Sequence, residues 1–199
     1  MIKLSILVLT TPRRRSNLFQ SIIGNLEKQA EGLPVEIIGL YDNKKRTVGA
    51  KRNAALKMAQ GEYTTFTDDD DVVAIDYVKS ILDCIKANPG VDVIVFDCET
   101  TVHKEGVPDE NHYSKYGKDF VYSITPGVDK DGFRQWRGKP AHTMVWRTEI
   151  AKIATFPDKN YAEDVGWVAL ANQLIKTEAR IDKVLYYYMF NSNISETRG

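Results

Sequence analysis

The first half of the chain alternates between two patterns of apolar residues. Short runs of aliphatic and β-branched residues predict buried strands over residues 3–9, 35–41, 63–67 and 91–97. Between these runs, apolar residues recur at helical spacing. The first predicted helix begins near Ser16 and the second covers 48–59. The third includes Ile75, Val78, Leu82 and Ile85. This alternation indicates an α/β fold with a mostly parallel sheet covered by helices.

The second half of the chain is less regular. Residues 99–140 are rich in loop-forming residues and show no clear period. After them we expect a strand over 143–147, helices over 148–154 and 163–176, and a last strand over 184–190. No linker-like segment divides the chain, so we predict one domain over 1–199, built from the halves 1–98 and 99–199.

Composition and charge exclude several classes of protein. The chain is 43% hydrophobic, which suffices for a core, and its 27 basic residues balance 27 acidic ones, so no net charge draws it to nucleic acid or membranes. Two cysteines do not make a disulfide framework. No run reaches the roughly 20 apolar residues of a membrane helix, and the basic residues 13–15 follow the first apolar run, unlike a secretory signal. We therefore expect a cytoplasmic protein without a membrane span.

Polar clusters follow the predicted strands of the first half. They lie at residues 10–13, 42–44 and 68–71 and at Asp97. In open α/β sheets, ligands bind beyond the carboxyl ends of the strands. We therefore expect these clusters to meet at one rim of the sheet and to form a binding site there.

The four adjacent aspartates at 68–71 point to a divalent cation. Neighbouring carboxylates repel one another unless a cation joins them, and an oxygen-only site suits Mg²⁺ or Mn²⁺. In an extended segment Asp68 and Asp70 point the same way, so we predict these two as metal ligands. The alternative is an acidic start of the next helix. Lys51 and Arg52 are also unusual, because they occupy a first helical turn, where the helix dipole favours acids.

Several motifs in order resemble glycosyltransferase family 2, whose members have the GT-A fold. They are Thr10-Thr11-Pro12, Asp42, Gly49-Ala50-Lys51-Arg52-Asn53, Gly61-Glu62-Tyr63, the aspartates 68–71 and Tyr161-Ala162-Glu163-Asp164-Val165-Gly166-Trp167. The resemblance covers about residues 3–190, with a poorer match in the middle. It implies a single GT-A-like domain whose mixed, mostly parallel sheet is flanked by helices, with a Rossmann-like nucleotide-binding half at 1–98 and an acceptor half at 99–199. The compact chain looks especially like short members encoded by tailed phages.

The resemblance implies transfer of a sugar from a nucleoside diphosphate sugar, a UDP-sugar being favoured, to an acceptor hydroxyl with inversion at the anomeric carbon. Mn²⁺ or Mg²⁺, held by Asp68 and Asp70, would offset the charge of the leaving group. Asp164 is the expected general base, with Glu163 orienting the acceptor or the helix end. The expected donor-binding residues are Thr10, Thr11, Pro12, Arg13, Asp42, Lys51, Arg52, Asp68 and Asp69.

The acceptor side rests on fewer residues. Trp136, His142 and Trp167 are candidate acceptor contacts, since aromatic faces stack on sugar rings, although core packing is the alternative for the tryptophans and a structural hydrogen bond for His142. The acceptor would be a glycan or a modified DNA. Many family members have a histidine after the last strand that completes the metal shell; here that stretch has Asn191 instead. The oligomeric state stays open.

Two other functions compete with this interpretation. Asp68 followed by Asp70 also fits the pattern of haloacid-dehalogenase-like phosphatases, in which the first aspartate is the nucleophile, although that motif normally follows the first strand. The basic clusters at 13–15 and 44–46 fit a non-catalytic module that binds nucleic acid or glycan.

Overall fold

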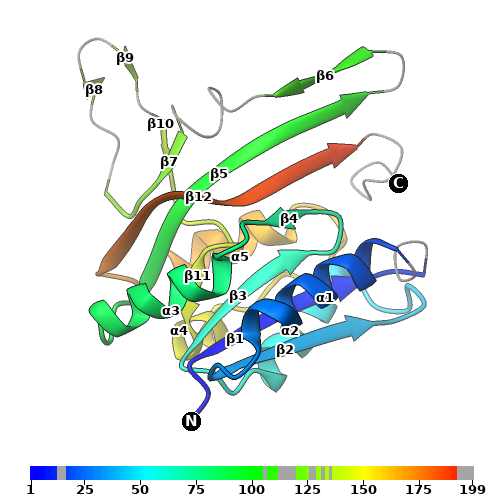
Figure 1. Ribbon diagram of the computed structural model, residues 1–199, viewed down its shortest axis with the longest axis horizontal. Helices are drawn as coiled ribbons and strands as arrows, with labels where there is room; N and C mark the ends of the chain where they lie inside the picture. The colour runs from blue at the N-terminus through cyan, green and yellow to red at the C-terminus, as the bar shows by residue number, and fades with distance from the viewer. Residues whose placement is uncertain are drawn as a thin grey trace.

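The computed structural model describes residues 1–12, 17–104, 107–111, 120–125, 129–130, 133–134 and 136–191. The predicted helix start at Ser16 and the basic cluster at 13–15 lie outside these residues. The first half forms β1 (Leu4–Thr10), α1 (Leu18–Ala30), β2 (Val35–Tyr41), α2 (Val48–Met58), β3 (Tyr63–Asp68), β4 (Val72–Val73) and α3 (Tyr77–Ala87) (Figure 1). The alternation of strands and helices predicted for this half is confirmed.

The second half begins with a long strand, β5 (Val93–Lys104), and ends with another, β12 (Glu178–Asn191). Between them lie α4 (Thr148–Ile153), α5 (Glu163–Ala171) and several short strands. These strands are β6 (Val107–Asn111), β7 (Phe120–Tyr122), β8 (Asp129–Lys130), β9 (Phe133–Arg134), β10 (Trp136–Gly138) and β11 (Val145–Arg147).

Within the described residues, eight strands form one mixed, mostly parallel sheet. Its order is β2-β1-β3-β11-β5-β12-β4, and β6 pairs with β5 beside this path. β1 runs parallel to β2 and β3, and β12 runs parallel to β5, whereas β11 is antiparallel to both of its neighbours. The fold is therefore the single α/β domain with flanking helices that the sequence predicted.

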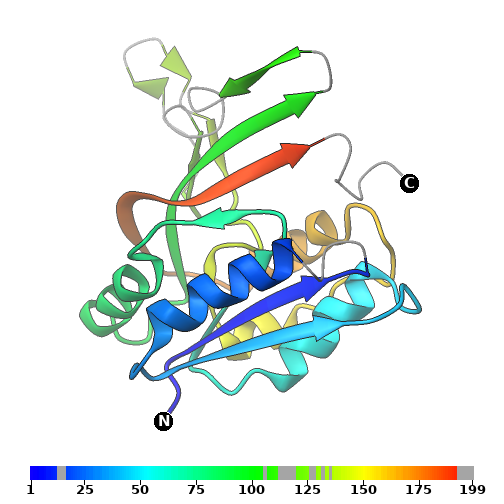
Figure 2. The ribbon, with the colours of Figure 1, turned by 45° about the vertical axis from the view of Figure 1, so that its right-hand side comes forward.

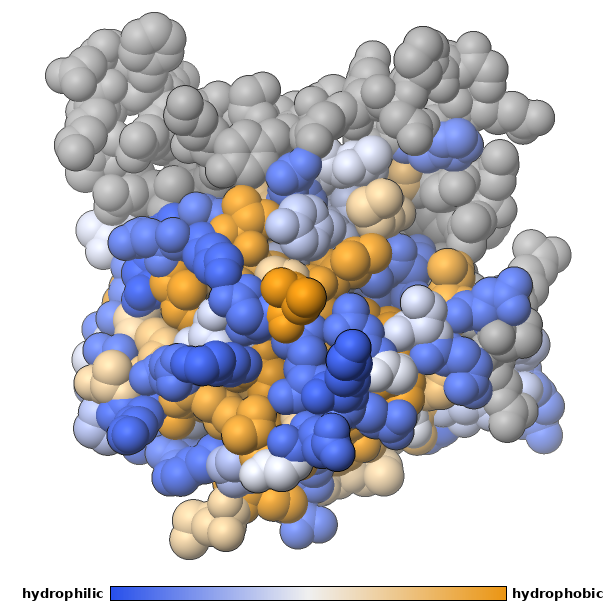
Figure 3. Space-filling model, viewed as in Figure 1, coloured by the Kyte–Doolittle hydropathy of each residue, from blue (hydrophilic) through white to orange (hydrophobic). Residues whose placement is uncertain are grey.

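Helices cover both faces of this sheet. α1 packs beside α3 on one face, and α2 packs against α4 and α5 on the other (Figure 2). β1 is buried along its whole length because both of its faces are covered. On the outside, hydrophilic side chains are interspersed with hydrophobic ones (Figure 3). None of the helices in the described ranges is long and apolar enough to cross a membrane.

Several predicted boundaries are wrong, and strand pairing explains the largest differences. β5 continues past Asp97 because β12 pairs with it up to His103, so Asp97 lies inside the sheet and forms an ion pair with Arg180 instead of standing at the rim. α5 ends at Ala171, earlier than predicted, and β12 then begins at Glu178. Ile75 precedes α3 and is 91% exposed, whereas the prediction placed it in the helix.

Candidate active site

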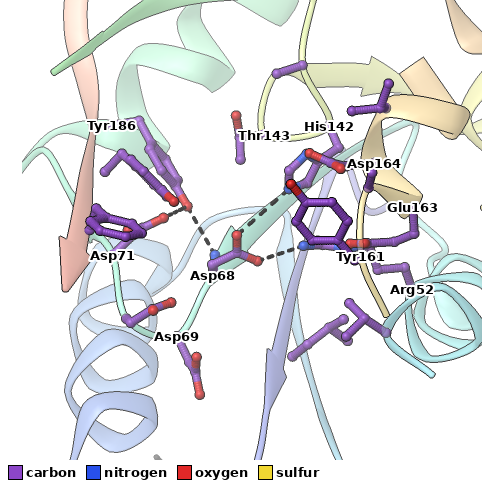
Figure 4. Close-up of a pocket in the computed structure, with 18 of the residues that line it drawn as sticks. Arg52, Asp68, Asp69, Asp71, His142, Thr143, Tyr161, Glu163, Asp164 and Tyr186 are labelled. Carbon is purple, nitrogen blue, oxygen red and sulfur yellow. Dashed lines mark hydrogen bonds and ion pairs between the residues drawn. The ribbon is translucent and has the colours of Figure 1, made fainter. Parts of the chain in front are cut away.

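A cleft of about 650 Å³ opens where β1 and β3 end. Thr10 and Thr11 lie at the end of β1, and the aspartates 68–71 follow β3. The first turns of α2, the start of α5 and one face of β12 complete its walls (Figure 4). The cleft therefore lies at the rim where the polar clusters were expected to meet.

Arg52 connects three elements at the base of the cleft. Its Nη2 donates to Asp68 Oδ1 at 3.0 Å, and its Nε donates to Glu163 Oε1 at 3.2 Å. The guanidinium carbon also lies 5.0 Å from the ring centre of Phe66 and 5.8 Å from that of Phe156, a cation–π arrangement. Only 6% of the arginine side chain is exposed. Arg52 thus ties the end of β3 and the start of α5 to α2.

His142 lies between two acidic residues of the cleft. Its Nε2 is 3.8 Å from Asp68 Oδ2, and its Nδ1 is 3.8 Å from Asp164 Oδ2. Burial by itself raises the pKa of Asp68, but the charge of Arg52 and the proximity of His142 outweigh burial and hold that pKa well below its usual range. Asp68 is therefore ionised at neutral pH. Asp164, whose side chain is 40% exposed, faces the solvent of the cleft.

The four adjacent aspartates take different partners. Asp69 is 3% exposed and accepts a hydrogen bond from Thr10 Oγ1 at 2.6 Å. Asp71 is also buried, and Figure 4 shows it directed away from Asp68, toward Tyr186. Burial, together with the charge of Asp68, raises the pKa of Asp71 well above its ordinary value. Asp69 and Asp71 therefore both accept hydrogen bonds from side chains inside the protein.

Tyr186 holds the aspartate turn in place from β12. Its hydroxyl donates to Asp71 Oδ2 at 2.6 Å and accepts from the backbone N–H of Asp68 at 3.1 Å. Asp71 Oδ1 also accepts from the backbone N–H of Met189 at 2.8 Å. The sequence analysis predicted only a strand over 184–190 here and missed this role of Tyr186. The signal available was a run of tyrosines spaced to alternate across a strand, which says nothing of the partner.

The start of α2 is fastened to the segment just before α5. Thr47 caps α2 by accepting from the Ala50 N–H, and the N–H groups of Val48 and Gly49 donate to Asn160 Oδ1 and Lys159 O. The backbone approaches so closely here that a Cβ on Gly49 would lie 1.9 Å from the carbonyl oxygen of Pro157. These contacts explain why a glycine precedes Lys51 and Arg52 in the sequence.

Asp42 stands outside the lining of the cleft. Its carboxylate accepts from Arg46 Nε at 3.0 Å and from the backbone N–H of Lys44 at 3.0 Å, and Lys51 Nζ lies 3.7 Å away. Burial by itself raises the pKa of Asp42, but Arg46 and Lys51 outweigh burial and lower this pKa. Lys51 does line the cleft, so Asp42 fixes a cation at its edge. The role of Asp42 in donor binding stays a prediction.

The other predicted residues divide into three groups. Trp167 is fully buried, stacks on Phe156 at 5.0 Å and donates its indole N–H to Ala151 O, so the expectation that it contacts an acceptor is wrong. Pro12 is exposed beside the cleft and does not line it. Arg13 lies outside the described residues, as do the side chains of Trp136 and Asn191.

The model of the family described as Glycosyl transferase family 2 matches residues 20–165, which includes most of α1, the aspartate turn and the start of α5. The chain belongs to this family. No curated protein matches the sequence of this chain.

Solved structures share the fold of this chain. S. aureus TarS 1-349 in complex with UDP-GlcNAc superposes with a TM-score of 0.64 at 18% identity, over 96% of this chain and 59% of that one. A mannosyltransferase from Pyrobaculum calidifontis, PcManGT, in complex with GDP-Man and Mn²⁺, superposes with a TM-score of 0.55 at 15% identity, over 93% and 56% of the two chains. The present chain spans 37% of the length of another TarS structure, at a TM-score of 0.64 and 19% identity.

Proposed function

We propose that this glycosyltransferase moves a sugar from a nucleoside diphosphate sugar, with UDP as the favoured nucleotide, to an acceptor hydroxyl with inversion at the anomeric carbon. The observation that carries the proposal is a single cleft lined by Asp68, Asp70 and Asp164 together with the cations Lys51 and Arg52. Structures with the same fold have been solved with UDP-GlcNAc, UDP and GDP-Man, which supports a nucleotide-linked donor.

Asp68 and Asp70 suit a divalent ion such as Mn²⁺ or Mg²⁺. Both line the cleft, and Asp68 is held ionised. Among the described residues, no three His, Cys, Asp or Glu side chains gather into a metal site. Two carboxylates nevertheless fit the way Mg²⁺ binds, because it takes one or two carboxylates and completes its shell with water and substrate phosphates. When bound, such an ion neutralises charge on the leaving diphosphate.

The donor would lie between the end of β1 and the start of α2. Thr10 and Thr11 are buried at the floor of this region. Arg52 uses Nε and Nη2 for its two ion pairs, and its buried Nη1 has no hydrogen-bond partner among the described residues. A buried donor of this kind is normally satisfied. A phosphate oxygen of the donor would satisfy it, and Lys51 would add a second positive charge nearby.

Asp164 is the carboxylate best placed to act as general base. Glu163, its neighbour, is 8% exposed and committed to Arg52, whereas Asp164 faces the cleft. Asp164 would accept the proton of the acceptor hydroxyl while that oxygen bonds to the anomeric carbon and the bond to the diphosphate oxygen breaks. A single displacement of this kind inverts the configuration. His142, beside Asp164, would orient this carboxylate.

The decisive experiment separates donor binding from transfer. Thermal unfolding of the wild type is measured with a panel of nucleoside diphosphates, with Mn²⁺ and with EDTA. A ligand at 100 times its dissociation constant stabilises a protein by about 2.7 kcal/mol, so a uridine nucleotide with Mn²⁺ should raise the melting temperature and EDTA should reverse the shift. The absence of a shift with every nucleotide would remove the proposal.

Substitution then tests the assigned roles. Asp164→Asn should keep the nucleotide-dependent shift and lower transfer by about 10²- to 10⁴-fold, the usual contribution of a general base. Asp70→Asn should weaken the Mn²⁺-dependent part of the shift. Asp83→Asn, on the outer side of α3 with its side chain 62% exposed, is the matched control and should change neither. Normal turnover by Asp164→Asn would show that another group is the base.

A further inference from the structure

One face of β12 carries an aromatic stripe that runs along the cleft. The stripe consists of Tyr186, Tyr188 and Phe190, which alternate along the strand and all line the cleft. Residues two apart on a strand share a face and are separated by about 6.6 Å. Tyr186 is 2% exposed and engaged with Asp71, whereas Tyr188 is 39% exposed. The stripe therefore begins at the aspartate turn and opens outward along the second half of the sheet.

The opposite wall also presents apolar surface. Tyr161 is 69% exposed and Val165 is 65% exposed, and both line the cleft on either side of Glu163 and Asp164. Tyr161 and Val165 are large, exposed side chains that flank Asp164 in the sequence, the carboxylate that would receive the acceptor proton. Such side chains are suited to contact a ligand.

The electrostatic environment of the stripe is acidic. Burial first, and then the charges of Asp71, Asp68, Asp70 and Asp164, raise the pKa of Tyr188 to about 12. Among the described residues that line the cleft, the basic side chains of lysine or arginine are those of Lys51 and Arg52. Both belong to α2, and they face the carboxylates of Asp42 and Asp68. No described cation lines the β12 wall. A chain of phosphates laid along this wall would therefore find no described lysine or arginine to pair with.

We propose that the acceptor is an uncharged glycan of at least two sugar rings, whose terminal hydroxyl reaches Asp164 and whose next ring stacks on Tyr188. This proposal rests on the proposed function, because it names the acceptor of the same cleft. Neutral rings gain contact with aromatic faces and need no cation beside them. A polyanion such as a modified DNA would gain the stacking, but no described lysine or arginine on this wall would balance its charge.

The test compares acceptors of different charge and length with a fixed UDP-sugar. The probes are a neutral aryl monosaccharide, the corresponding aryl disaccharide, and a single-stranded oligonucleotide that carries hydroxymethyl groups. The disaccharide should have a KM about tenfold lower than the monosaccharide. Tyr188→Ala should remove that preference, and Tyr188→Phe, which keeps the ring, should retain it. Ile75→Ala, at an exposed site outside the cleft, should leave every value unchanged.

Hydrolysis of the donor in the absence of acceptor separates the two proposals. A wild type that neither binds nor hydrolyses any nucleotide sugar contradicts the proposed function itself. A wild type that hydrolyses the donor, yet uses the oligonucleotide better than either glycoside, with a KM that rises steeply with salt, overturns the glycan proposal alone. Equal KM values for mono- and disaccharide, or an unchanged preference in Tyr188→Ala, would also overturn it.

Discussion

Replacing Arg52 with methionine should destabilise the protein more than any exposed charge substitution. Methionine keeps much of the packing against Phe66 and Phe156 but leaves Asp68 and Glu163 without their shared partner. The cost is largest at Glu163, because its side chain is only 8% exposed and its charge cannot be solvated without moving α5.

The size of the effect follows from this burial. Removing one partner of a buried ion pair costs about 3–5 kcal/mol, because a charge is left uncompensated. An exposed pair contributes roughly 0–1 kcal/mol. Arg46→Met is the matched control, since Arg46 also pairs with an aspartate but its side chain is 41% exposed. Arg52→Met should therefore lower the free energy of unfolding several times more than Arg46→Met.

Urea unfolding at pH 7 measures the difference, with the m-value checked for two-state behaviour. The double variant Arg52→Met/Glu163→Gln should recover part of the loss, because the stranded carboxylate is gone. The pH dependence gives an independent check on Asp68. Its lowered pKa in the wild type contributes stability above the unfolded-state pKa, and this contribution is lost as the pH falls through the folded-state pKa. In Arg52→Met, less stability should be lost as the pH falls, because Asp68 no longer has Arg52 to lower its pKa.

Two results would refute this reasoning. One is a loss in Arg52→Met no larger than in Arg46→Met. The other is a double variant as unstable as the single one, which would mean that Glu163 does not depend on Arg52.

Two further predictions concern the walls of the cleft. Gly49→Ala should lower the free energy of unfolding by about 1–3 kcal/mol, because the new Cβ would overlap the carbonyl of Pro157. Gly24→Ala is the control: no described atom lies within 4 Å of its Cβ, so it should stabilise α1 by roughly 0.5–1 kcal/mol. Urea unfolding measures both changes. The raised pKa of Asp71 means that the folded protein loses stability as the pH rises from the unfolded-state pKa toward the folded-state one. Asp71→Asn should flatten that part of a stability–pH curve, and an unchanged slope would show that Asp71 does not titrate there.

Local patterns predicted β1 to β3 and α1 to α3 because each of these elements is decided by its own apolar residues, whereas β4, which forms by pairing with β12, was not predicted. β2 was predicted with the bounds that the structure has, and α2 within one residue. The second half failed where distant pairing decides the outcome. Residues 99–104 are a strand because β12 and β6 pair with them, and Trp167 is buried because Phe156 and Trp146 surround it. Neither fact is visible in a window of sequence.

The site shows the same division. Asp68, Arg52 and Asp164 were identified from motifs, and the structure places all three in one cleft. The bond between Tyr186 and Asp71 was missed because the two residues lie 115 positions apart and meet only when β12 reaches the aspartate turn. Polar residues with obvious chemistry are found by type, whereas the side chains that hold them depend on the assembled sheet.

The place of β11 in the sheet has a consequence for biosynthesis. This three-residue strand fills the slot between β3 and β5, and it is encoded after both of them. While the ribosome is still making the residues before 145, the facing edges of β3 and β5 have no partner in this slot. Unpaired strand edges attract other chains. Completion of the sheet therefore depends on the late arrival of one very short segment, and premature termination before it would leave a nascent protein prone to self-association.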